Sequence, residues 1–65
     1  MKINKKKLNI FIVKDSRTLK EIAINAQIDV VTLGRILSGK QKPRRSTIGR
    51  IAKALHVDVT EILED

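Results

Sequence analysis

A chain of 65 residues is long enough for one small domain with a modest core. It has no cysteine, which excludes disulfides and thiolate metal sites and favours a reducing cytoplasm, and one aromatic residue, which excludes base stacking on aromatic side chains. The formal net charge of +7 fits either a polyanionic partner or a solvated basic surface.

The first predicted helix covers residues 5–14. Leu8, Phe11 and Ile12 share one face at helical spacing, although the β-branched residues and the alternation of this segment would also allow a strand. A single strand would have no sheet to join, so we expect a helix. The apolar run at residues 10–13 is too short for a signal peptide or a membrane span.

Ile10 and Val13 lie outside the inner stripe of this first helix. If they are exposed, they form an apolar patch that could dimerise or dock a partner. Alternatively, they pack beneath the N-terminal arm or the C-terminal helix. The sequence leaves both interpretations open.

Two further helices begin at residues that suit helix N-termini. Thr18 and Glu21 form a capping box, in which each side chain bonds the backbone N–H of the other residue. The third helix is expected from Asp29, a carboxylate N-cap, to about Leu37. Gly39 then ends it in the left-handed conformation.

Only about three residues, 26–28, separate the second helix from the third. Two short helices joined so tightly must cross at a steep angle, which predicts a helix-turn-helix over residues 18–38. The expected inward-facing positions of this pair are Leu19, Ile22, Ala23, Ala26, Leu33, Ile36 and Leu37.

Residues 40–45 form a basic loop in which Pro43 prevents helix continuation. A fourth helix is expected from near Ser46 and a fifth from Asp58, another carboxylate cap. The sequence therefore predicts an all-α fold: one domain, residues 1–65, a compact bundle of about five short helices with a basic arm at residues 1–7. The inward positions of the last two helices are Ile48, Ile51, Ala52, Leu55, Val59, Ile62 and Leu63.

The outward face of the third helix is unusual for a solvated surface. Val31 and Arg35 lie furthest from the core, with Val30, Thr32 and Gly34 beside them. Methyl groups can contact thymine methyls in a DNA major groove, and Arg35 can bond a guanine or a phosphate. Gly34 costs about 1 kcal/mol of helix propensity relative to alanine but permits close approach. A protein contact patch is the alternative.

Charge is also unevenly distributed along the chain. Lysines gather at residues 2–7 and cations at residues 40–45, whereas residues 58–65 carry four acids and no base. One end of the molecule is therefore unsuited to a phosphate backbone. This asymmetry favours a nucleic-acid partner over a uniformly solvated basic surface.

Residues 18–61 resemble the lambda-repressor-like (Cro/cI or Xre-type) helix-turn-helix family. The motifs that carry the resemblance are TLKEIA at residues 18–23, TLGRI at residues 32–36 followed by Gly39, and Pro43 followed by IAKALHVDVTEIL at residues 51–63. Each motif is weak alone, but together, in this order and at this spacing, they are typical of the family.

The resemblance implies that the third helix, residues 29–37, enters the major groove. It assigns base reading to Val30, Val31, Thr32 and Arg35. It assigns backbone contacts to Thr18, Leu19, Lys20, Ser38, Lys40, Lys42, Arg44 and Arg45. We expect a cytoplasmic, sequence-specific regulator of transcription that binds double-stranded DNA, most simply a repressor. Since family members mostly bind palindromic operators as dimers, a homodimer is a possible form.

The chain departs from the family pattern at defined positions. Gln27 replaces the glycine of the tight turn, so the turn is either strained by roughly 1–2 kcal/mol or of different geometry. Ile12 and Leu37 together replace an arginine and a glutamate that pair in the family's interior, so we expect them to touch. His56 replaces the glycine that ends the fourth helix, which indicates a capping role.

Nothing in the sequence forms a catalytic constellation. His56 is the only histidine, there is no metal-ligand spacing, and no glycine-rich phosphate loop is present. We therefore expect no enzymatic activity, catalytic residue, cofactor, metal or small-molecule ligand. The alternative function is a protein-binding module, such as an antitoxin or an antirepressor. A basic membrane-surface helix at residues 2–14 is disfavoured because such helices need a cleaner polar face, so no membrane partner is expected.

Overall fold

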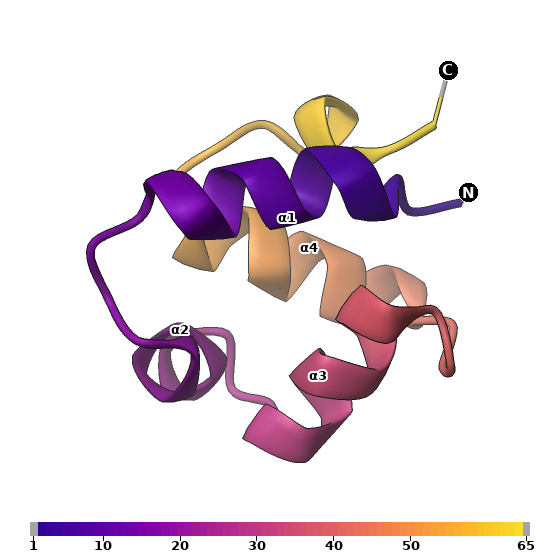
Figure 1. Ribbon diagram of the computed structural model, residues 1–65. Helices are drawn as coiled ribbons and strands as arrows, with labels where there is room; N and C mark the ends of the chain where they lie inside the picture. The colour runs from indigo at the N-terminus through magenta and orange to yellow at the C-terminus, as the bar shows by residue number, and fades with distance from the viewer. Residues whose placement is uncertain (1, 65) are drawn as a thin grey trace.

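The computed structural model describes residues 2–64. These residues form four α-helices and one 3-10 helix and no strand, namely α1 (Lys5–Lys14), α2 (Leu19–Asn25), α3 (Val30–Ser38), α4 (Arg45–Ala54) and η1 (Val59–Ile62) (Figure 1). The predicted all-α fold of about five short helices is confirmed. Residues 1 and 65, the ends of the predicted domain, lie outside the described residues.

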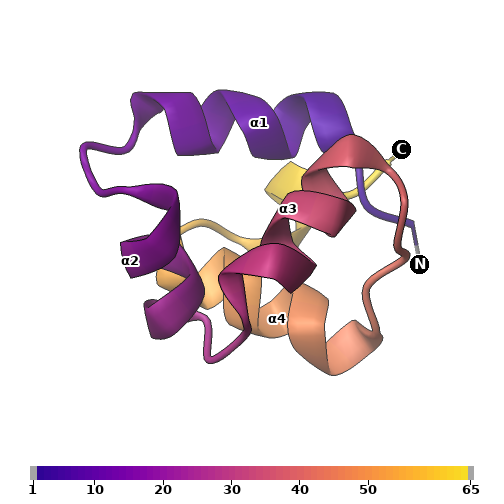
Figure 2. The same cartoon turned by 60° about the horizontal axis from the view of Figure 1, so that its bottom comes forward.

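Helix α3 packs against both α1 and α2, while α4 packs against α2 and η1, and η1 also contacts α1. Figure 2 shows α3 crossing in front of the molecule, with α2 on one side and the loop that leads to α4 on the other. The described segments near the two ends of the chain lie side by side, with Ile3 bridged to Leu63. This arrangement leaves one flank of α3 without a covering element.

The core receives side chains from every helix. Its largest fully buried members are Leu8, Ile22, Leu33, Ile36, Ile48, Ile51 and Ile62. Among the remaining predicted core positions, the alanines and Leu55 are also buried. The others, among them Ile12 and Leu37, are half-buried and pack around this centre. By contrast, Ile10 is 45% exposed and Val13 is 82% exposed, so neither packs beneath a chain end.

Three helices end in the same way, although only one of them ends in glycine. Gln27, Gly39 and His56 have φ of 60°, 82° and 58°, in the left-handed region. In each case the next residue donates its N–H to a carbonyl five positions back, in the pairs Ile28–Ala23, Lys40–Arg35 and Val57–Ala52. These bonds define the Schellman motif. Gln27 therefore keeps the tight turn in its left-handed form, and His56 caps α4 as predicted.

The last two helices start close to the expected residues. Helix α4 begins at Arg45, next to the expected Ser46, and follows an extended Arg44 that makes no side-chain cap. The last helix is a four-residue 3-10 turn, with Asp58 accepting from the backbone of Thr60. At the other end, Asn4 caps α1. Residues 5–7 of the basic arm thus form the first turn of α1.

Candidate nucleic-acid interface

The start of α3 presents its side chains to solvent. The Asp29 carboxylate accepts a hydrogen bond from the backbone N–H of Val31 at 2.7 Å and so fixes the first turn. Leu33 is fully buried on the inner face, whereas Val31 is 57% exposed and Arg35 is exposed on the outer face. The helix therefore displays the two methyl groups of Val31 and the guanidinium of Arg35 one turn apart, as the helical periodicity predicts.

The four residues assigned to base reading fall into two groups. Val31 and Arg35 are exposed, whereas Val30 and Thr32 are half-buried at the flanks of the same turn. Beside them, a Cβ added to Gly34 would meet no heavy atom within 4 Å. Nothing inside the protein therefore requires a glycine at this position, which leaves close approach from outside as a reason for it.

The end of α3 positions the basic loop. The Arg35 carbonyl accepts the backbone N–H of Lys40 at 2.9 Å and the Ser38 hydroxyl at 3.1 Å. The chain consequently leaves the helix sharply at Gly39, and the side chains of Lys40, Lys42, Arg44 and Arg45 are all exposed. These four cations follow the exposed face of α3 along the chain without an ion pair among the described residues.

The start of α2 supplies the other group of predicted backbone contacts. The Glu21 N–H donates to the Thr18 hydroxyl at 3.1 Å, and the Thr18 N–H donates to the Glu21 carboxylate at 3.0 Å. The backbone N–H of Thr18 holds the pKa of Glu21 below its usual value, with the Thr18 hydroxyl bond adding to the effect. Lys20 is exposed and Leu19 is half-buried. Figure 2 places this group and the basic loop on either side of α3.

One set of contacts has no counterpart in the sequence expectation. The Arg17 guanidinium donates to the Asp15 carboxylate through Nε at 2.9 Å and Nη2 at 2.6 Å, and Nη2 also donates to the Ala54 carbonyl at 2.6 Å. These bonds join the α1–α2 loop to the last residue of α4. The side-chain hydrogen bond from Arg17, with a second from its backbone N–H, lowers the pKa of Asp15 to about 2.

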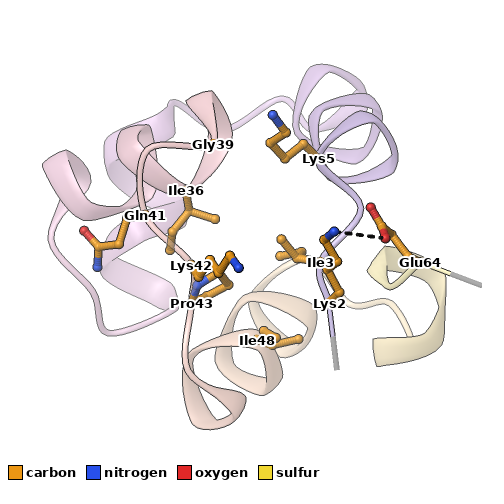
Figure 3. Close-up of a pocket in the computed structure, with 10 residues that line it drawn as sticks. All are labelled: Lys2, Ile3, Lys5, Ile36, Gly39, Gln41, Lys42, Pro43, Ile48 and Glu64. Atoms are coloured by element: carbon orange, nitrogen blue, oxygen red, sulfur yellow. Dashed lines mark ion pairs between the residues drawn. The ribbon is translucent and has the colours of Figure 1, made fainter.

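The N-terminal arm pairs with the C-terminal segment. Ile3 and Leu63 form an antiparallel bridge, and the Glu64 N–H donates to the Lys2 carbonyl at 2.9 Å. The Lys2 ammonium lies 4.0 Å from the Glu64 carboxylate, a spacing that contributes little in solvent (Figure 3). Between this arm and the basic loop lies a hollow of about 330 Å³, where Lys5 points toward Gly39 (Figure 3).

The described part of the chain has neither a candidate metal site nor a membrane-spanning helix. No group of three or more histidine, cysteine, aspartate or glutamate side chains among residues 2–64 could hold a metal ion. Within the same residues, no helix combines the length and the apolar character needed to cross a bilayer.

An exposed helix held by a tight turn against a second helix defines the helix-turn-helix class. A family described as "Helix-turn-helix domain" matches residues 14–64, and the chain belongs to this family. Domains of this family are typically DNA-binding and non-enzymatic. Comparison with curated proteins and with solved structures finds no significant match.

Proposed function

We propose that the chain is a sequence-specific regulator of transcription that binds double-stranded DNA and belongs to the lambda-repressor-like, Xre-type group of helix-turn-helix proteins. One observation carries the proposal. The start of α3 is exposed at Val31 and Arg35, is open at Gly34, and is followed directly by a loop of unpaired cations. A major groove accepts a helix of this kind while phosphates on its walls attract the cations.

In this proposal the residues divide by reach. Val31 and Arg35 lie on the groove floor, with Val30 and Thr32 at the edge of the contact. Thr18, Leu19 and Lys20 approach one backbone from the start of α2. Ser38, Lys40, Lys42, Arg44 and Arg45 approach the other backbone from the end of α3. The residues at the end of α3 include most of these cations and therefore contribute most of the salt dependence of binding.

Repression is the simplest regulatory outcome, because a bound domain blocks access to its site without a further contact. Binding as a homodimer would place two copies of α3 in successive major grooves and give a palindromic operator. We place this regulator in the cytoplasm, because a sequence without cysteine favours a reducing compartment.

Selection of bound sequences from a random duplex library tests the proposal. We expect an enriched motif, and a palindrome if the protein binds as a dimer. Titration of the selected duplex with salt should give a log–log slope of roughly −3 to −5, since three to six phosphate contacts per subunit contribute about −0.9 each. Failure to enrich any motif would remove the claim of sequence specificity.

A protein-binding module, such as an antitoxin or an antirepressor, is the second candidate. Its support is the pair Ile10 and Val13 on α1, which are 45% and 82% exposed. Affinity for duplex DNA that barely changes with salt would favour this function over the first. The two candidates thus give opposite results in the same titration.

A further inference from the structure

A second concentration of positive charge lies outside the residues assigned to DNA. It surrounds a cleft of about 500 Å³ between the end of α2, the tight turn that follows it, and the end of α4. The residues that line this cleft are Arg17, Asn25, Gln27, Arg50, Lys53, Ala54 and His56. Three of them are permanently charged cations, one is a histidine, two are amides, and none is an acid.

Among residues 2–64, the positive charge of this cleft is compensated only at Arg17. Arg50, Lys53 and His56 are exposed and make no ion pair within the described residues. Two carboxylates lie near Arg17: both oxygens of Asp15 accept hydrogen bonds from it, and Glu21 is held nearby by the backbone N–H of Thr18. The Asp15–Arg17 pair is therefore close to neutral, and Arg50 and Lys53 remain without a counter-charge.

The Arg17 guanidinium is held in position before any ligand arrives. Its Nε and Nη2 atoms are occupied by Asp15, and Nη2 is occupied also by the Ala54 carbonyl at 2.6 Å. The remaining donor, Nη1, has no hydrogen bond to another described residue. A fixed donor binds an anion with little loss of side-chain entropy.

The chemistry of the lining selects a class of ligand. Guanidinium and ammonium groups with two neighbouring amides suit phosphate oxygens, which accept several charge-assisted hydrogen bonds. A single phosphate would occupy only a small part of a cleft of this volume. No aromatic ring lines the cleft, so recognition would depend on phosphates rather than on a stacked base.

We propose that this cleft binds a compact di- or triphosphate through Arg17, Arg50 and Lys53, with Asn25 and Gln27 as neutral donors. The site goes beyond DNA binding and uses none of the residues assigned to it. Because Gln27 is the left-handed residue of the tight turn, a ligand here would contact the joint between α2 and α3.

The test uses inorganic triphosphate as the probe and the full 65-residue chain. Isothermal titration should show saturable binding of one triphosphate, and backbone amide NMR shifts should concentrate on Asn25, Gln27 and residues 50–56. Arg50→Ala and Lys53→Gln should each weaken binding about tenfold, as expected for a lost charge-assisted hydrogen bond. The matched control is Lys42→Ala, which removes the same charge from the basic loop and should change affinity by less than about twofold.

Three results would overturn the site. Shifts spread over all the lysines, or an equal effect of Lys42→Ala, would mean that the ions gather on the whole basic surface. Tighter binding of a glutamate-rich peptide of matched charge would assign the cleft to a protein partner. Loss of duplex DNA affinity in Arg50→Ala and Lys53→Gln to the extent seen in Lys42→Ala would place the cleft in the DNA interface. Circular dichroism melts confirm that each variant is folded.

Discussion

Gly34→Ala should separate stability from DNA binding. An added Cβ meets no heavy atom within 4 Å, so the substitution is free of internal clash. Alanine is favoured over glycine by about 0.8–1 kcal/mol in a helix interior, and the half-buried position lies within α3. We therefore expect a gain of about 1 kcal/mol, which for a domain of this size raises the melting temperature by roughly 4–8 °C.

The same methyl should weaken binding to the selected duplex. If α3 lies in the major groove with Gly34 against the DNA, the added methyl forces the helix outward and costs about 1.4 kcal/mol or more, a tenfold loss. Thermal melts and fluorescence anisotropy with the selected duplex measure the two effects. Gly49→Ala is the matched control, since Gly49 lies in α4 with an equally open Cβ position and outside the proposed interface. A stabilised Gly34→Ala protein with unchanged DNA affinity would refute the close approach of this face.

Three further predictions concern stability. Gln27→Gly and His56→Gly should each raise the free energy of unfolding by about 0.5–1 kcal/mol, because glycine adopts φ near 60° without the strain of a side chain. Urea melts measure this change, and no gain would mean that these turns are unstrained. Leu37→Glu should lower the free energy of unfolding by about 2–3 kcal/mol, less than a fully buried unpaired charge would, because Leu37 is half-buried. Adding Ile12→Arg should recover part of this loss by pairing the two charges. A double variant no more stable than Leu37→Glu alone would show that the two positions are not in contact. Since the pKa of Asp15 is 3.8 in the unfolded chain and about 2 in the folded one, its stabilisation is complete only above about pH 5 and is lost as the pH falls through 2. The stability difference between the wild type and Asp15→Asn should therefore shrink over this interval, and a constant difference would contradict the assignment.

Local signals in the sequence were sufficient to predict the starts of α2, α3 and η1 and the end of α3. The capping box at Thr18, the carboxylate caps at Asp29 and Asp58, and the end of α3 at Gly39 depend on residues within a few positions of each other. The family pattern identified Gln27 and His56 as replacements of usual glycines. It left the geometry of the Gln27 turn open and predicted a capping role for His56, and both residues adopt the left-handed conformation. These features follow from backbone hydrogen bonding, which is local along the chain.

Contacts between distant segments could not be predicted in this way. Nothing near Arg17 indicates that its guanidinium bonds the carbonyl of Ala54, because a backbone carbonyl carries no sequence signal. The pairing of Ile3 with Leu63 likewise depends on the chain ends meeting after the helices have packed. The cationic cleft at Arg50 and Lys53 arises from the same folding, since its lining comes from three separate segments.

The DNA-reading residues were predicted from the helical wheel and the family resemblance. The structure exposes Val31 and Arg35 on the outer face of α3, as the wheel requires, but half-buries Val30 and Thr32. Contact with DNA remains a prediction for all four. Arg35 is exposed, and a guanidinium in this position can bond a guanine through two hydrogen bonds.

In the proposed complex, α3 reads bases while the basic loop holds the DNA backbone. The most direct measurement compares Arg35→Ala with Lys42→Ala, each titrated with the selected duplex and with random duplex at several salt concentrations. Arg35→Ala should cost about 1–3 kcal/mol on the selected duplex and relax the preference at one base step. Lys42→Ala should weaken both duplexes equally and make the salt slope shallower by roughly one unit. If Arg35→Ala instead lowers both affinities alike, α3 is a backbone anchor, and base reading by this helix is contradicted.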